Sequence, residues 1–188
     1  MLFRSQPVGA GSGAAFATQP VVKVLDVNDI VVESSTASIT VSASAGTLGG
    51  TTTLSATNGV ATFTDLTFAG TAATNYTLSF ASTGLTSATS SNFTVSVGAA
   101  TQLVLTTSAA GSAYGSAFTT QPVVEIRDAG GNKVTTATNQ VTATPSSGTV
   151  VGTGNSTAVA GVATFSGLGL SSTPGSVTVT YSATGLTS

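Results

Sequence analysis

The stretch FATQPVVKVLD at residues 16–26 returns in similar form as FTTQPVVEIRD at residues 118–128, an offset of 102 residues. The stretch GVATF recurs at the same offset, once at residues 59–63 and again at residues 161–165. Two anchors that keep one offset over this distance indicate a duplicated structural unit of about 100 residues. The duplication is the strongest pattern in the sequence, and it guides the interpretation of the rest of the chain.

A third anchor, TGLTS, marks the end of each copy. It occupies residues 83–87 and residues 184–188, so one residue is lost between Phe68 and this anchor in the second copy. The repeat predicts two tandem domains, residues 1–98 and residues 99–188, each long enough to bury a core of its own. The second domain has no counterpart of the last residues of the first, and we predict that it lacks the final strand.

Alternation of apolar and polar residues predicts strands in both copies. Val22 and Val24 flank Lys23, and Val124 and Ile126 flank Glu125. This period of two places the apolar side chains on one face of a sheet. Turn residues such as those of Asn-Gly and Asp-rich segments separate the strands at short intervals, which is typical of antiparallel sandwiches. The predicted core residues are Val22, Val24, Phe63, Val124, Ile126 and Phe165.

The first copy is expected to contain seven short strands and no helix. A short linker, Gly98–Thr101, follows the last of them and leads into the second copy. The predicted fold is therefore all-β, with two tandem immunoglobulin-like antiparallel β-sandwiches, the second without its last strand. The predicted strands span residues 2–6, 19–26, 37–43, 51–56, 60–68, 76–82 and 91–97.

Composition excludes several classes of function. The chain of 188 residues has 4 Lys and Arg, which are scattered in sequence, so no basic surface for nucleic acid or for anionic lipid is expected. No apolar run is long enough to span a membrane. Because Cys and His are absent, the chain has no disulfide, thiolate ligand or His-dependent triad. We expect neither an enzyme nor a bound cofactor.

The few acidic residues suggest one candidate metal site. Asp26, Asn28 and Asp29 offer oxygen ligands close together in sequence, as calcium requires. The alternative, which we favour, is that Asp and Asn are present because their side chains stabilise a turn.

A second group of polar residues is expected at the junction of the two domains. In a sandwich of this kind, the loop after the second strand lies at the end where the chain enters. Asp128, Asn132 and Lys133 are therefore predicted to face the far end of the first domain, near Asp65, and to help set the angle between the domains.

The stretch QPVVEIRDAGGNKV at residues 121–134 resembles the signature of bacterial immunoglobulin-like (Big-type) repeats. GVATF at residues 161–165, followed by Leu168, resembles another strand of that family. The first copy departs at the turn, where Asp26-Val27-Asn28-Asp29 replaces Asp128-Ala129-Gly130-Gly131. The resemblance implies an immunoglobulin-like fold and a place in the stalk of an adhesin, surface-layer or fibre protein. A shared fold does not fix a shared function.

Three functional hypotheses remain from the sequence. The first is a structural spacer in an extracellular or cell-surface protein, with neighbouring immunoglobulin-like repeats as its partners and its export signal outside this chain. The second is a self-assembling homo-oligomer or filament, in which another chain donates the strand that the second domain lacks. The third is an adhesion module that binds a glycan or a protein, for which exposed clusters of aromatic residues would be the usual sign.

Overall fold

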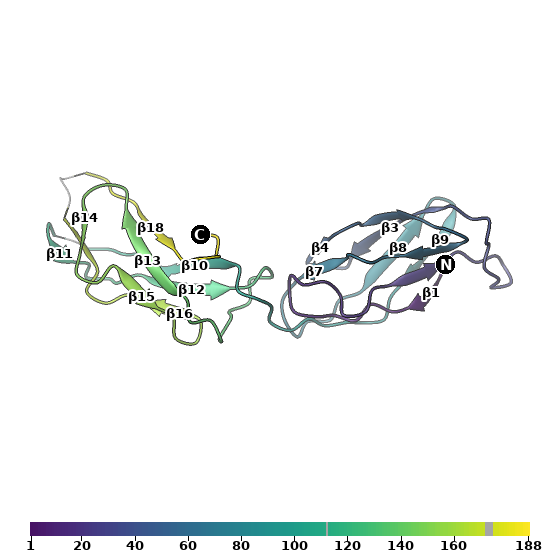
Figure 1. Cartoon of the computed structure of the whole chain (residues 1–188), viewed down its shortest axis with the longest axis horizontal. Coiled ribbons are helices and arrows are strands. Elements are labelled where there is room, and N and C mark those ends of the chain that lie inside the picture. The colour runs from purple at the N-terminus through teal and green to yellow at the C-terminus, as the bar shows by residue number, and fades with distance from the viewer. Residues whose placement is uncertain (112, 172–174) are drawn as a thin grey trace. The chain divides into compact units, whose positions relative to one another are not determined.

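The computed structural model describes residues 1–111, 113–171 and 175–188, and every regular element among them is a strand. The contacts divide the chain into two compact units, Met1–Gly98 (unit one) and Ala99–Ser188 (unit two). The ladders are antiparallel, and the predicted all-β class is confirmed. Figure 1 labels the strands of both units.

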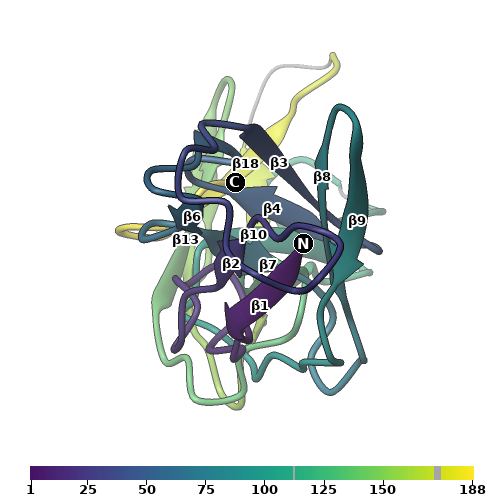
Figure 2. The same ribbon diagram turned by 90° about the vertical axis from the view of Figure 1, so that its right-hand side faces the viewer.

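Unit one is built from two main sheets. One has the order β1-β2-β6 and the other the order β5-β3-β8-β9, while β4 and β7 form a short pair. Seen end-on in Figure 2, β1 and β2 lie in a different layer from β3, β8 and β9. The strands are β1 (Leu2–Ser5), β2 (Val21–Lys23), β3 (Ser38–Ala43), β4 (Thr47–Gly49), β5 (Thr53–Ser55), β6 (Val60–Thr62), β7 (Thr67–Ala69), β8 (Leu78–Ser82) and β9 (Leu85–Thr89).

Unit two repeats this arrangement with two differences. Its sheets have the orders β10-β12-β16, β15-β13-β18 and β11-β17-β14. Among the described residues, β18 pairs with one strand where its counterpart β8 pairs with two, and β11 adds a strand to the short pair. The strands are β10 (Gln102–Thr107), β11 (Ser116–Ala117), β12 (Val123–Arg127), β13 (Gln140–Pro145), β14 (Thr149–Val151), β15 (Asn155–Thr157), β16 (Val162–Thr164), β17 (Gly169–Ser171) and β18 (Val179–Ser182).

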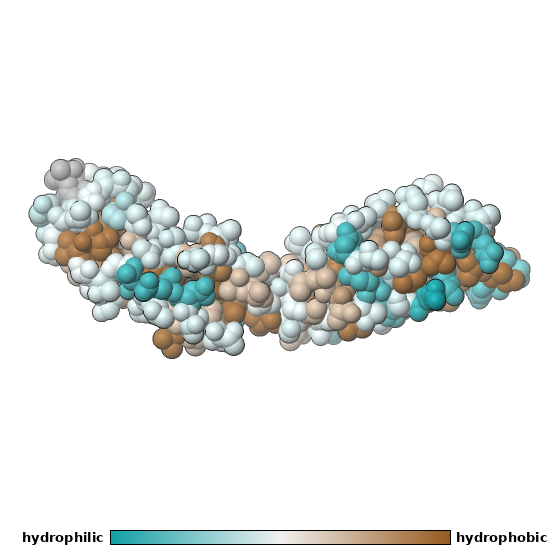
Figure 3. Space-filling model, in the orientation of Figure 1, coloured by the Kyte–Doolittle hydropathy of each residue, from teal (hydrophilic) through white to brown (hydrophobic). Residues whose placement is uncertain are grey.

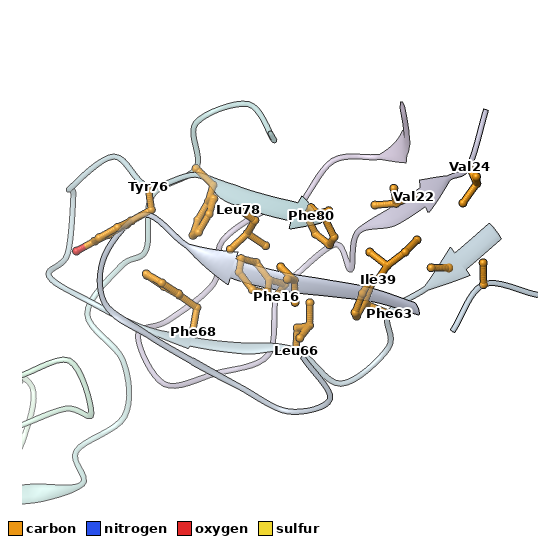
Figure 4. Packing of buried hydrophobic residues seen from close by; sticks show 14 of the residues in the cluster. Phe16, Val22, Val24, Ile39, Phe63, Leu66, Phe68, Tyr76, Leu78 and Phe80 are labelled. Carbon is orange, nitrogen blue, oxygen red and sulfur yellow. The ribbon is translucent and has the colours of Figure 1, made fainter. Parts of the chain in front are cut away.

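Alternating side chains from facing sheets form the core of each unit. In unit one, Val22 of β2 and Ile39 of β3 are completely buried, and the ring of Phe63 packs edge-on against Phe80 with centroids 5.4 Å apart. Figure 4 shows these side chains pointing toward one another between the sheets. In unit two the equivalent pair is Phe165 and Tyr181. The six residues named from the sequence lie in these cores: Val22, Val24, Phe63, Val124, Ile126 and Phe165.

A two-residue hairpin precedes β6 and β16. In unit one it uses Asn58 and Gly59, with φ of 49° and 72°. In unit two the same left-handed positions are held by Ala160 and Gly161, with φ of 50° and 76°. Two consecutive positive φ angles define the hairpin turn that best matches strand twist, and Asn-Gly is its favoured sequence. Unit two therefore places an alanine where the turn favours asparagine.

Two of the predicted strands need correction, and two further strands were not predicted. The segment 60–68 is two strands, because the chain leaves the sheet of β2 after Thr62 and joins β4 as β7. The segment 91–97 forms isolated bridges in place of a regular strand, since Phe93 pairs antiparallel with Tyr76 and Ser96 pairs parallel with Gly11. The short strands β4 and β9 were not predicted. The shorter loop of unit two, including Pro174 of its Pro-Gly turn, passes through residues 172–174, which lie outside the described residues.

Candidate functional site

The aspartate turns of the two units have the same geometry. Oδ1 of Asp26 accepts hydrogen bonds from the backbone N–H groups of Asn28 (2.8 Å) and Ile30 (2.9 Å). Oδ1 of Asp128 accepts from Gly130 and Asn132 at 2.9 Å each. Unit one departs from the repeat signature at this turn, but the aspartate accepts the same two backbone hydrogen bonds in both units. Asp29 takes a left-handed φ of 60° where unit two has a glycine.

The candidate metal ligands of unit one are thus placed by the needs of a turn. Asp26 already accepts two backbone hydrogen bonds, which is the local role that aspartate commonly has in turns. Among the described residues, no group of three or more acidic, His or Cys side chains is arranged to hold a metal ion. Calcium binding by Asp26, Asn28 and Asp29 stays a prediction.

Asp65 closes a loop within its own unit. Its carboxylate accepts hydrogen bonds from the backbone N–H of Thr51 at 3.0 Å and from the Thr51 hydroxyl at 2.8 Å. These bonds, led by that of the Thr51 side chain, lower the pKa of Asp65 below its ordinary value of 3.8 although the carboxylate is exposed. The side chain therefore links the start of the β5 segment to the loop before β7.

The other proposed junction residues belong to the loop after β12. Asp128 is completely buried, and the side-chain amide of Asn132 donates to both of its carboxylate oxygens at 3.0 Å. Gln102 donates to the Asp128 carbonyl oxygen, while Lys133 is exposed. A part in setting the angle between the units stays a prediction for Asp65, Asp128, Asn132 and Lys133.

Residues 88–97 of unit one cover one edge of the sheet that contains β8. Ala88 pairs with Phe80 of β8, and the backbone N–H of Ser90 donates to the Leu78 carbonyl oxygen at 2.8 Å. Tyr76 and Phe93 then exchange two backbone hydrogen bonds of 2.9 Å. These contacts continue the sheet of β8 beyond its last regular strand.

The same segment next reaches the other side of the sandwich. The Ser96 N–H donates to the Ala10 carbonyl oxygen at 3.0 Å, and the Ser12 N–H donates to the Ser96 carbonyl oxygen at 2.9 Å. The Cβ that a side chain at Gly9 would carry lies 1.9 Å from the Thr94 carbonyl oxygen, so only glycine permits this approach. Residues 88–97 therefore lie between two extended segments of unit one. They run antiparallel to the segment at Tyr76 and parallel to the segment at Gly11.

Phe93 is the centre of an aromatic cluster in unit one. Its ring lies 5.0 Å from Phe16, 5.2 Å from Phe68 and 6.0 Å from Tyr76, measured between centroids. All four rings are at least 95% buried. Tilted and edge-on pairs at these distances contribute beyond simple burial. Figure 4 shows Phe68 and Tyr76 at one end of the core, with Phe16 nearer to its middle.

In unit two the counterparts of this cluster are less covered. The alignment pairs Phe16 with Phe118 and Tyr76 with Val177, and both unit-two residues are only half-buried. Ser12, which is 3% exposed, corresponds to Tyr114, which is 78% exposed. No residue of the 188 aligns with Phe93. Over the residues that the structure describes, Phe118 and Val177 are therefore less covered than their counterparts Phe16 and Tyr76.

A groove with a volume of about 320 Å³ lies between β10 and β18 of unit two. Leu105 is 43% exposed at this site, while Tyr181 is 7% exposed and burial raises the pKa of its phenol. Neither a catalytic base nor a metal ligand lines the groove, whose chemistry is that of apolar side chains and strand backbone. The lining residues include Leu103, Leu105, Val124, Val179, Tyr181 and Ser188.

Sequence analysis did not predict that Phe118 and Val177 are only half-buried. The signal was present in the alignment, because the partners of Phe93 in unit one map directly onto Phe118, Leu170 and Val177. Figure 3 shows a surface of mostly intermediate hydropathy, interrupted by small strongly polar and apolar areas.

Comparisons with known proteins add one structural match. No protein-family model matches the chain, and no curated protein matches it. Among solved structures, the chain is similar to invasin, a bacterial integrin-binding protein, with 18% identity and a TM-score of 0.36. The match covers 99% of this chain and 37% of the invasin chain, so the chain spans about a third of that protein's length. The described residues contain no helix that could cross a membrane. We therefore base the proposed function on the chain itself.

Proposed function

We propose that the chain is a structural spacer, a pair of immunoglobulin-like repeats in the stalk of an extracellular bacterial surface protein, without catalytic activity. The observation that carries the proposal is the path of the chain through unit one. The terminal amine of Met1 donates to the Thr86 carbonyl oxygen, beside the turn between β8 and β9. The chain leaves at the other end of the unit, where Gly98 packs against the Ser12 backbone. Figure 1 shows these two positions.

When the chain enters a unit at one end and leaves it at the other, each repeated unit adds its full length to the stalk. The linker Gly98–Thr101 contains no proline, and its short length limits how far apart the two units can move. Each unit also has its own buried core, so neither needs the other to fold around. These features suit a repeated spacer better than a site built between two domains.

The surface composition supports the same proposal. Charged residues make up 5% of the chain, and Ser, Thr, Ala and Gly supply much of the rest. Small, weakly charged side chains permit neighbouring stalks to lie close together. The aromatic residues that glycan-binding and protein-binding surfaces usually display are buried or half-buried here, apart from Tyr114.

Small-angle X-ray scattering of the 188-residue chain tests the spacer proposal. A single compact domain of this length would have a radius of gyration of about 16 Å. We expect a clearly larger radius and a distance distribution with two maxima, because two linked units lie end to end in a spacer. A radius near that of one compact domain, unchanged when the linker is lengthened by four glycines, would contradict the proposal.

A further inference from the structure

Two extended segments of unit one, residues 9–12 and residues 94–98, lie side by side in parallel. Gly11 and Ser96 form a parallel bridge, and every other strand pair or bridge that the structure describes in unit one is antiparallel. The Ser96 N–H donates to the Ala10 carbonyl oxygen, and the Ser12 N–H donates to the Ser96 carbonyl oxygen. We propose that this parallel pair, the clamp, bears tension and resists extension of unit one along the chain.

The direction of the two segments decides how tension acts on the clamp. The chain comes into the clamp at the start of residues 9–12 and leaves unit one directly after residues 94–98. Tension along the chain therefore slides the parallel segments past each other, so the hydrogen bonds between them must break together. Antiparallel segments in the same place would have both loaded ends on one side, and their bonds would open one after another.

Close backbone contact marks both ends of the clamp. A Cβ at Gly9 would lie 1.9 Å from the Thr94 carbonyl oxygen, and a Cβ at Gly98 would lie 1.9 Å from the Ser12 carbonyl oxygen. Only glycine permits either approach. Between these contacts Val95 is 4% exposed, and its carbonyl oxygen accepts a hydrogen bond from the Ala73 N–H at 2.9 Å. The second segment is therefore attached to the body of unit one as well as to the first segment.

Ser12 attaches the first segment to the end of β7. Its hydroxyl donates to the Gly70 carbonyl oxygen at 2.9 Å and accepts from the Gly70 N–H at 3.0 Å. The next residue, Gly13, donates its N–H to the Phe68 carbonyl oxygen at 2.8 Å. Ser12 is 3% exposed, so little water competes for these bonds. Unit two has Tyr114 at the equivalent position, and this attachment through a serine hydroxyl is specific to unit one.

The inference rests on the proposed spacer function, because a stalk transmits tension through each of its repeats. The two can nevertheless fail separately. A compact arrangement of the units in the scattering experiment would contradict the spacer without changing the force that unit one withstands. A clamp that bears no force would leave two units that still lie end to end.

Constant-force measurements with magnetic tweezers test the clamp in the full chain. The chain has no Cys, so two introduced cysteines define the points of attachment. Val8→Cys with Ala99→Cys loads the clamp in shear, whereas Ala14→Cys with Ala99→Cys places both attachments at the same end of the clamp. All three side chains are exposed, and unit two lies outside both loaded spans. At equal force, unit one should survive at least about fivefold longer in shear, because at least one further hydrogen bond must break in the same step.

Two buried serines provide matched variants in the shear arrangement. Ser90 is 7% exposed, and its hydroxyl also donates one hydrogen bond, to the Ser91 carbonyl oxygen, and accepts one, from the Leu78 N–H. Ser12→Ala should shorten the lifetime of unit one under force about fivefold, because its bonds break when the clamp breaks. Ser90→Ala should leave the lifetime unchanged, since bonds that are intact at the rupture step do not affect its rate. Both variants should lower the stability of unit one in urea.

Two results would overturn the proposal. Equal lifetimes in the two pulling directions would show that the parallel pair does not bear the load. Equal shortening by Ser12→Ala and Ser90→Ala would reject the part assigned to Ser12, because each serine would then contribute only to general stability. Circular dichroism confirms the fold of each variant first, and the two pulling directions can be compared without either serine variant.

Discussion

At the scale of single residues, the two units differ in how well each turn is matched to its sequence. The exposed Ala160 has a φ of 50°, in the left-handed region that asparagine tolerates much better than alanine. We expect Ala160→Asn to raise the free energy of unfolding of unit two by about 0.5–1 kcal/mol. Urea denaturation followed by hydrogen exchange in each unit measures the change.

The reciprocal variant is the control for this turn. Asn58→Ala creates in unit one the sequence that unit two has naturally, at a position with a φ of 49°. It should lower the stability of unit one by a similar amount and leave unit two unchanged. If Ala160→Asn did not stabilise unit two, the left-handed backbone would not be the cause of the difference.

Asp65 gives unit one a pH dependence with a definite sign. Its folded-state pKa is lowered, chiefly by the Thr51 hydroxyl, so its contribution to stability is present above the ordinary pKa of 3.8. That contribution is lost as the pH falls through the lowered pKa of the folded protein. Thr51→Val should raise the pKa of Asp65 part of the way back, because the backbone N–H bond remains.

Carboxyl chemical shifts in a pH titration of the Thr51→Val chain measure this effect. Thr40→Val is a suitable control, since the Thr40 hydroxyl bonds to Thr53 and not to Asp65. An unchanged pKa in Thr51→Val would show that the hydroxyl is not the main cause of the shift.

At the scale of elements, alternating side chains predicted the positions of most strands. The prediction was wrong where one extended segment changes its pairing partner along its length, as in residues 60–68 and 91–97. β4 (Thr47–Gly49) is three residues long and lies between Gly46 and Gly50, and glycines at such short spacing are typical of a turn in sequence. β9 (Leu85–Thr89) is mostly polar because it is the outer strand of a tight hairpin at Gly84. Residues 91–97 alternate well, but the segment passes from one sheet to the other. Alternation indicates an extended chain without naming its partner.

The aspartate turns allow the same element to be tested in two settings. Asp128 is buried and its carboxylate accepts hydrogen bonds from the backbone of Gly130 and Asn132 and from the Asn132 side chain, whereas Asp26 is exposed and accepts from the backbone of Asn28 and Ile30. Asp128→Ala leaves the N–H groups of Gly130 and Asn132 without their acceptor, and we expect a loss of about 1–3 kcal/mol from unit two. Asp26→Ala should cost unit one less, since water can replace the carboxylate there.

Thermal and urea denaturation of both variants measure the two costs. Circular dichroism of the folded chains confirms that each variant keeps its strands before the comparison is made. Equal losses for Asp26→Ala and Asp128→Ala would mean that the burial of Asp128 does not strengthen its role in the turn.

At the scale of the whole molecule, duplication explains why the fold was predictable and why the groove was not. The repeat anchors and the alternating valines identify two copies of one sandwich from sequence alone. By contrast, Leu105 is exposed and Phe118 is half-buried in unit two, whereas their counterparts Phe3 and Phe16 in unit one are half-buried and buried. Such a difference becomes visible only when each core is compared side chain by side chain.

The two units should therefore differ in stability within the intact chain. Unit one buries Phe93 and Val95 against its core, and burial of a large apolar side chain stabilises by about 1.5–3 kcal/mol. Unit two has no described counterpart of these contacts, and its aromatic pair is Phe165 with Tyr181. We expect unit two to unfold at a lower urea concentration than unit one. Hydrogen exchange at increasing urea, assigned to each unit by mass spectrometry, measures both transitions.

Added contacts of this kind should narrow the difference in stability between the units. A chain extended after Ser188 by ATSSNFTVSVG, the sequence of residues 88–98, would offer unit two counterparts of Phe93 and Val95, so its unit-two transition should move to higher urea. An extension in which both apolar positions are serine separates the effect of apolar burial from that of added length. If the two extensions stabilised unit two equally, burial of these two apolar side chains would not be the cause of the difference between the units.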